Sequence, residues 1–329
     1  MDLLKKWGRN LADANIKIPV SVIATILGLA SLGNLYRMLG FEVFWPTAGV
    51  LGIIIVLYTL IKYIRYPRVM AEEFKNPAIV GLFPCPAMIM MIIGAFLRPY
   101  FPAFAKGLWL FSFAFFAIIL VLFLYIHMFK YRDKNKFNPG FLVPFCSYIV
   151  GTVVGTGMDE PEFCRALIAL SFFTFLVVLP YTFYRLLKKP PEGYAKLSKF
   201  IIVAPFGLLG ASALNFYPDL SPAAVAAFFI ATLVVYIYIF GTTIPAVITK
   251  PFVAGHAAMT FPSAIASVFT YRYFVYLSGQ DSYWAGLVRN IAGVQLFIST
   301  AIIAYVLVNY IRVLWGVLNE ERGKADNAA

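Results

Sequence analysis

The chain is a succession of long apolar stretches separated by short polar joints. A membrane-spanning helix needs about 20 consecutive, mostly apolar residues, and ten stretches approach or exceed that length. They cover residues 16–38, 46–65, 79–98, 106–129, 141–157, 164–187, 200–217, 222–248, 254–278 and 285–316. The joints are too short to hold a water-soluble domain. The pattern predicts an all-α integral membrane protein in which residues 1–329 form a single transmembrane domain of ten spans.

Prolines recur at near-regular intervals, and each lies early in an odd-numbered span. They are Pro19, Pro86, Pro144, Pro205 and Pro262. A repeat of this kind predicts five helical hairpins, each with one proline-kinked helix. A proline inside a helix frees a backbone carbonyl, which in a membrane must be buried in protein or face water. We therefore expect the odd helices to line a central pore and the bulkier, straighter even helices to lie outside them.

Composition excludes a soluble protein, because 61% of the residues are hydrophobic and only 13% are charged. The formal net charge is +12, and most Lys and Arg residues fall in the joints on the side of the two termini. By the positive-inside rule, both termini are expected to be cytoplasmic, in a multi-pass protein of the plasma (inner) membrane. The basic joints are expected to contact anionic lipids and to gather small anions at the inner mouth. No nucleic-acid partner is expected.

The chain offers little for catalysis or metal binding. Its three cysteines, Cys85, Cys146 and Cys164, lie in apolar surroundings and are expected to be free thiols. The two histidines, His127 and His256, are far apart and do not form a metal-binding motif such as H-E-x-x-H. We therefore expect no metal, no cofactor and no enzyme activity. The predicted pore helices also have few ionisable groups near their centres, unlike carriers that are coupled to protons or Na⁺.

Four segments resemble the tellurite-resistance/dicarboxylate transporter (TDT) family. They are 18–33 (IPVSVIATILGLASLG), 72–88 (EEFKNPAIVGLFPCPAM), 137–151 (FNPGFLVPFCSYIVG) and 258–267 (AMTFPSAIAS). This family includes bacterial TehA, the slow-type anion channels of plant guard cells and the malate permeases of yeast. The resemblance implies a homotrimer in which each protomer has ten helices. It also implies that five odd helices enclose a pore closed near its middle by a phenylalanine.

The gate residue implied by the resemblance is Phe261, directly before Pro262, and a second pore phenylalanine corresponds to Phe83. Further pore-lining candidates are Thr260 and Ser263, which flank the gate, and Phe145 and Phe206, which are equivalent positions by internal repetition. The family often has tryptophans before the T-F-P motif, whereas this chain has Gly-His-Ala-Ala at 255–258.

Basic residues lie toward the predicted outer ends of the odd helices, among them Arg98 and Arg272. They are candidates for an outer vestibule that attracts anions, although long basic side chains also reach the membrane surface for structural reasons. The sequence predicts an anion channel, or a channel-like permease, that passes small anions such as chloride and nitrate passively. The alternative is a proton-coupled carrier of C4-dicarboxylates (malate), sulfite or tellurite on the same fold, with His256 as a titratable group.

Overall fold

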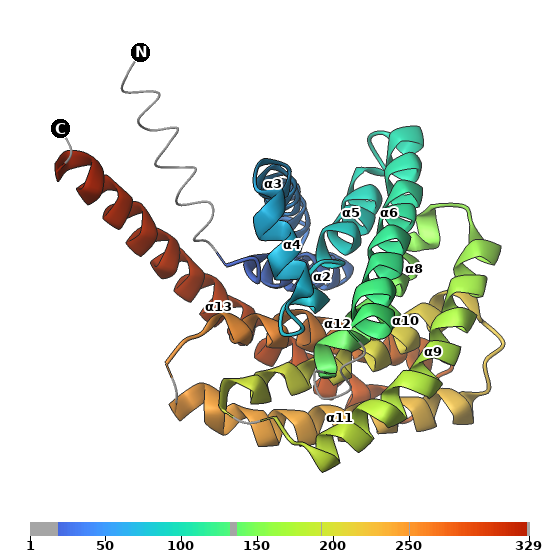
Figure 1. Ribbon diagram of the computed structural model, residues 1–329. Coiled ribbons are helices and arrows are strands. Elements are labelled where there is room, and N and C mark those ends of the chain that lie inside the picture. The colour runs from blue at the N-terminus through green and yellow to red at the C-terminus, as the bar shows by residue number, and fades with distance from the viewer. Residues whose placement is uncertain (1–18, 132–136, 192, 250, 328–329) are drawn as a thin grey trace.

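The computed structural model describes residues 19–131, 137–191, 193–249 and 251–327 (Figure 1), and within these ranges it is helical and free of strands. Seven helices are long and apolar enough to cross a membrane. They are Phe44–Arg65, Val80–Leu97, Pro102–Lys130, Pro161–Lys188, Lys196–Phe216, Pro222–Thr249 and Ala285–Val317. Shorter apolar helices cover Val22–Met38 and Pro139–Val153. The chain is a multi-pass membrane protein.

Three of the ten predicted spans do not appear among these seven helices, so the arrangement of ten spans in five hairpins remains a prediction. Helix α2 (Val22–Met38) has only 17 residues and is therefore counted among the shorter apolar helices. Predicted span 141–157 is divided into α7 (Leu142–Cys146), a 3₁₀ turn and α8 (Val150–Val153). Helix α12 (Thr260–Ser278) has 19 residues, but Arg272 and several tyrosines lower its hydropathy.

The helices form an inner ring and an outer layer. Segments α2, α5 (Cys85–Leu97), α8, α10 (Val203–Phe216) and α12 each contact the next, and α12 closes the ring against α2. Their side chains are mostly buried; in the spans that contain α5 and α10 the buried share is 78% and 72%. The outer helices are α3 (Phe44–Arg65), α6 (Pro102–Phe123), α9 (Pro161–Lys188), α11 (Pro222–Thr249) and α13 (Ala285–Asn327). Only 28% to 33% of their most apolar windows is buried, which suits contact with lipid.

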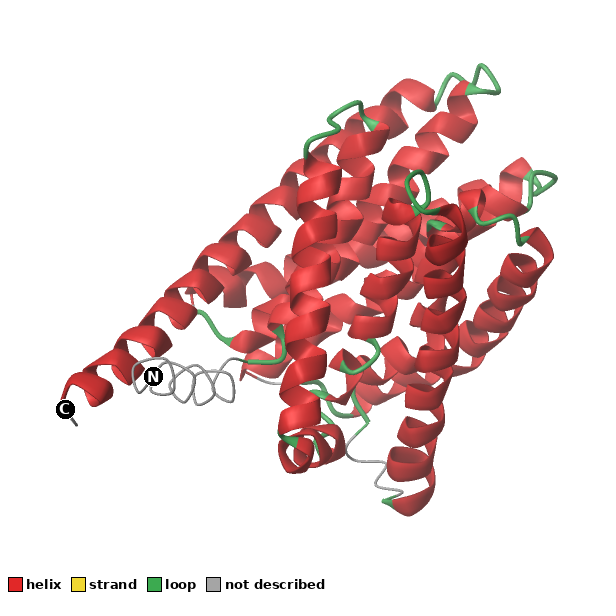
Figure 2. Cartoon of the chain, turned by 90° about the horizontal axis from the view of Figure 1, so that it is seen from above, coloured by secondary structure: helices red, strands yellow, loops and turns green. Residues whose placement is uncertain are grey.

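Connections lie mainly at the two ends of the bundle, and α13 extends beyond its neighbours toward the C-terminus (Figure 2). One connection is the short helix α4 (Pro67–Lys75), which follows α3. Three 3₁₀ segments precede inner helices: η1 (Val80–Leu82), η7 (Gly193–Ile202) and η8 (Ala254–Met259). A fourth, η4 (Pro139–Phe141), precedes α7.

The repeated prolines begin the inner helices and do not kink them, contrary to the prediction. Pro86 is the second residue of α5, whereas Pro144, Pro205 and Pro262 are the third residues of α7, α10 and α12, and Pro19 precedes α2. A proline is tolerated in the first turn because the N–H it lacks has no partner within the helix. Beyond the first turn, the described α-helices that contain a proline are α9, with Pro180, and α11, with Pro245.

Glycines allow the inner ring to pack closely around α12. A Cβ atom at Gly28 of α2 would lie 2.8 Å from the backbone nitrogen of Phe261, and one at Gly207 of α10 would lie 2.9 Å from the carbonyl of Ile265. Both contacts are with backbone atoms, so a larger residue would force the helices apart. The two glycines therefore place α12 between α2 and α10 and fix the position of Phe261.

Candidate functional site

A cavity of about 820 Å³ lies within the inner ring, at the N-terminal ends of its helices. Four inner helices, α2, α5, α10 and α12, contribute to its wall through residues that include Leu27, Met88, Ala204 and Phe261. The 3₁₀ turn before α8 contributes Ser147. The rest of the wall comes largely from the loops and 3₁₀ segments that lead into these helices. The proline-led first turns therefore surround an open chamber, as expected for the end of a pore.

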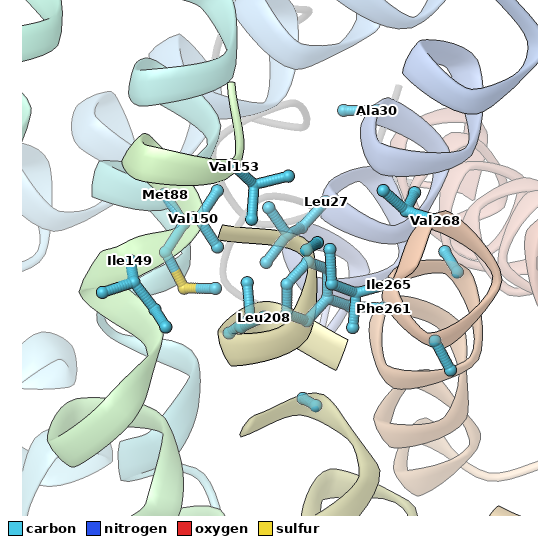
Figure 3. Packing of buried hydrophobic residues seen from close by; sticks show 14 of the residues in the cluster. Leu27, Ala30, Met88, Ile149, Val150, Val153, Leu208, Phe261, Ile265 and Val268 are labelled. Atoms are coloured by element: carbon cyan, nitrogen blue, oxygen red, sulfur yellow. The ribbon is translucent and has the colours of Figure 1, made fainter. Parts of the chain in front are cut away.

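The cavity ends at Phe261, whose side chain is 6% exposed. Figure 3 shows Leu27, Leu208 and Ile265 around the phenylalanine ring, with Met88 and Ile149 facing them. All of these side chains are apolar and belong to one buried cluster. The chamber is thus closed at this end by a hydrophobic constriction.

A second, very small pocket lies beyond the constriction. Its volume is about 10 Å³, about the space of one water molecule. Leu27, Met88 and Phe261 line the large cavity, and the residues four positions later, Ser31, Ile92 and Ile265, line the small one. Because four residues make about one helical turn of 5.4 Å, the apolar barrier between the two spaces is about one turn long.

The hydroxyl groups beside Phe261 are engaged with the backbone. Thr260 Oγ1 donates a hydrogen bond to the carbonyl of Ala24 at 3.1 Å and to that of Ala257 at 2.8 Å. Ser263 Oγ donates to the carbonyl of Thr260 at 3.0 Å. Both residues are fully buried, and the cavity wall includes neither of them. Thr260 therefore ties the first turn of α12 to α2, which fixes the backbone of Phe261.

The other predicted pore phenylalanines point away from the cavity. Phe83 stacks on Tyr63 at 5.3 Å between ring centroids and meets Phe74 edge-on at 4.7 Å, in a separate aromatic cluster. Phe145 contacts Phe123 of α6, and Phe206 contacts Phe175 of α9 and Phe228 of α11. Of the four candidate rings, Phe261 alone lines the chamber.

The two candidate vestibule arginines differ in their partners. Arg98 forms an ion pair with Asp159 at 2.5 Å and donates to the carbonyl of Gly157 at 2.7 Å. Arg272 donates to the carbonyls of Val153, at 2.9 Å, and Ala211, at 3.2 Å, and to the side-chain oxygen of Asn215. None of the described carboxylates forms an ion pair with Arg272. Arg272 therefore joins α8, α10 and α12 through hydrogen bonds to neutral groups.

His256 does not face the chamber, although Gly255 and Ala257 line it. Its ring is fully buried, stacks on Phe252 at 5.2 Å and meets Tyr305 at 5.7 Å. Its Nδ1 accepts a hydrogen bond from the backbone N–H of Val253 at 3.1 Å. These contacts hold the histidine in an aromatic pocket behind the cavity wall.

Comparison with known families agrees with this geometry. Residues 17–312 match the model of the SLAC1 family, described as voltage-dependent anion channel. The chain belongs to the SLAC1 family. The match covers most of the chain and confirms the resemblance to the TDT family. No curated protein matches the chain. SLAC1 family members are channels or transporters and not enzymes, so membership implies a function in anion transport.

The sequence did not indicate that one residue, Glu73, lines the chamber of this SLAC1-family protein. Glu73, near the end of α4, lines the cavity and forms an ion pair with Lys62 of α3 at 3.2 Å. Tyr63 also donates a hydrogen bond to the carboxylate at 2.9 Å. In the sequence Glu73 lies within the segment 72–88 that resembles the TDT family, but nothing in that segment indicates a pairing with Lys62. Only the packing of α4 against the bundle brings it to the chamber.

Proposed function

We propose that this protein is a passive anion channel whose pore runs along the axis of the inner ring and is closed by Phe261. The observation that carries the proposal is the cavity of about 820 Å³, whose wall includes residues of α2, α5, α10 and α12 and of the turn before α8, and which ends at that ring. A chamber open to ions on one side and blocked by apolar side chains on the other is the arrangement of a gated pore.

The chemistry of the wall favours weak interaction with anions. The chamber is lined mainly by apolar groups, with hydroxyls such as Ser147 and Ser198 and the amide of Asn76 among them. Conduction requires binding weak enough for an ion to leave, and such groups bind a small anion weakly. On the far side of Phe261, the unneutralised guanidinium of Arg272 supports an anion as the transported species. We assign small monovalent anions, such as chloride and nitrate, as the substrates.

Opening requires the Phe261 ring to leave the axis. In the closed form an anion would lose its water against Leu27, Leu208 and Ile265, which cannot replace the lost hydrogen bonds. A rotation of the ring about its side-chain dihedrals would join the large cavity to the small pocket beyond it. The tie between Thr260 and Ala24 supports a fixed backbone around which the ring moves.

The wider architecture follows the family. We infer ten spans in five hairpins, a single transmembrane domain, cytoplasmic termini in the plasma membrane and a homotrimer. The seven long apolar helices, together with the shorter inner segments, support the number of spans. The many exposed aliphatic and aromatic side chains on the outer helices, such as Ile54, Ile118 and Phe173, support contact with lipids or with other protomers.

The test is the anion current of the wild type beside Phe261→Ala, with chloride, nitrate and malate compared at several pH values. We expect a large, non-saturating current in the variant that does not depend on pH. Saturable malate or sulfite uptake that follows the proton gradient, without current, would instead establish the carrier. The position of His256 behind the wall does not favour that second mechanism.

A further inference from the structure

The chamber wall contains a single charged side chain among the described residues, and it is acidic. The wall is otherwise formed by apolar side chains, glycine, hydroxyls, the thiol of Cys85 and the amides of Asn76 and Asn138. The exception is Glu73. A carboxylate in the wall of an anion pathway repels the transported ion, so its presence calls for a functional explanation.

The carboxylate is held in place beside the chamber by two side chains of α3. Its Oε1 lies 3.2 Å from Nζ of Lys62, and its Oε2 accepts a hydrogen bond from the Tyr63 hydroxyl at 2.9 Å. The side chain of Lys62 is 1% exposed, whereas that of Glu73 is 21% exposed. The negative member of the pair is therefore the one that an ion in the chamber meets.

The position of Glu73 on its own helix is electrostatically unfavourable. It lies in the last turn of α4, which ends at Lys75, and the carboxyl end of a helix carries partial negative charge. Lys62 offsets that repulsion. Burying an ion pair generally adds little net stability, because both ions lose water. The pair as a whole therefore adds little stability, and within it Glu73 neutralises the buried charge of Lys62.

We propose that Glu73 is a specificity-determining residue that makes the chamber favour monovalent over divalent anions. This proposal rests on the proposed function and names the class of ion that the pathway admits. The Coulomb energy between Glu73 and an anion is proportional to the charge of the anion. A dianion at a given point is therefore repelled twice as strongly as a monoanion. The fixed carboxylate thus lowers the share of dicarboxylates among the ions that reach Phe261.

The test measures the ratio of malate to lactate permeability at neutral pH, where malate is a dianion and lactate a monoanion of related chemistry. It uses the Phe261→Ala background, so that the gate does not limit the current. We expect Glu73→Gln to raise the ratio by about three- to tenfold, because it removes one unit charge from the wall at nearly constant shape.

The matched control is Glu72→Gln, one position earlier. Glu72 is 76% exposed, pairs with Lys75 at 3.0 Å and does not line the cavity, so this change removes the same charge from the same helix. It should leave the ratio unchanged. An unchanged ratio in Glu73→Gln, or an equal rise in both variants, would overturn the proposal. Size-exclusion profiles of the detergent-solubilised variants show whether each one is folded.

Binding to the closed chamber provides a readout that does not need conduction. A ligand that binds the folded state raises the melting temperature of the purified protein, so malate and lactate titrations give apparent affinities. Glu73→Gln should strengthen malate binding relative to lactate by a similar factor, and Glu72→Gln should not. If Phe261→Ala passes no anion, the proposed function fails while binding still decides the role of Glu73. If it conducts and neither ratio changes, only the role of Glu73 is refuted.

Discussion

Replacing Phe261 with alanine distinguishes a gate from an ordinary core phenylalanine, because the two roles predict different results. The ring closes a barrier only about one helical turn thick, between a chamber of about 820 Å³ and a pocket of about 10 Å³. Removing it joins the two spaces and lets water reach both sides of Leu27 and Ile265. A dry barrier costs an ion several kcal/mol in lost hydration. At 1.36 kcal/mol per tenfold change, wetting it should raise the anion current by at least about 100-fold.

Phe269 of the same helix is the matched control. It is 1% exposed, and its ring fills a notch at Gly210, where an added Cβ would lie 2.4 Å from the ring. It also packs near Phe228 and Phe229 of α11, away from the chamber. Truncating a buried phenylalanine to alanine costs about 3–5 kcal/mol when it leaves a dry void. Phe269→Ala should therefore lower the melting temperature without creating a current.

The assay pairs currents in planar bilayers with melting temperatures of the same purified proteins. Phe261→Ala should conduct and should lose less stability than Phe269→Ala, because its void opens onto the chamber and can fill with water. A folded Phe261→Ala protein with wild-type current would refute the gate. Equal currents in the two variants would refute the reasoning as well, since they would indicate a general loosening of α12.

Three further experiments test the inner helices around Phe261. Gly28→Ala should destabilise the protein by about 1–3 kcal/mol, because the added Cβ would lie 2.8 Å from backbone atoms of α12. Gly107 has open space around it, so thermal melts of Gly107→Ala should show no such loss of stability. Arg272→Gln should reduce the chloride current of the Phe261→Ala variant severalfold, because it removes the unneutralised charge beyond the constriction, and an unchanged current would exclude an electrostatic role. A small, negatively charged thiol reagent should react with Cys85, which lines the cavity, and so reduce the current of the Phe261→Ala variant. Cys85→Ser should abolish this inhibition, whereas Cys146→Ser and Cys164→Ser should not.

The sequence was sufficient to predict an all-helical membrane protein and most of its long spans. The predicted span 79–98 corresponds to the apolar helix Val80–Leu97, for example. It was not sufficient to show how the prolines act. Predominantly apolar residues lie on both sides of Pro86 and Pro262, and the apolar pattern alone does not show that a 3₁₀ segment changes to an α-helix there. The change becomes visible only in the backbone.

The same backbone change explains the direction of the Phe83 ring. Phe83 was proposed as a pore residue from the family resemblance, and the backbone between it and Pro86 passes from η1 into α5. Each residue turns by about 120° in a 3₁₀ helix and 100° in an α-helix, so a count across the junction gives the wrong face. Phe261 lies next to Pro262 within the first turn of α12, so no change of helix type separates the two residues. Glu73 depends on a partner eleven positions away on another helix, which no local pattern reveals.

Fixed charges of opposite sign lie on the two sides of the constriction. Glu73 lines the chamber before Phe261, and Arg272 lies eleven residues beyond it on α12, bonded to the carbonyl of Val153, which lines the small pocket. A thin apolar barrier screens such charges poorly, because charges interact more strongly in a medium of low dielectric constant than in water. The field between them therefore acts on an anion mainly where it has least water, and it favours the Arg272 side. In the proposed channel, an anion that enters from the chamber would be held back by the carboxylate and drawn toward Arg272 once the ring moves. On this proposal, Glu73 would select anions by valence and Arg272 would attract them, on opposite sides of Phe261.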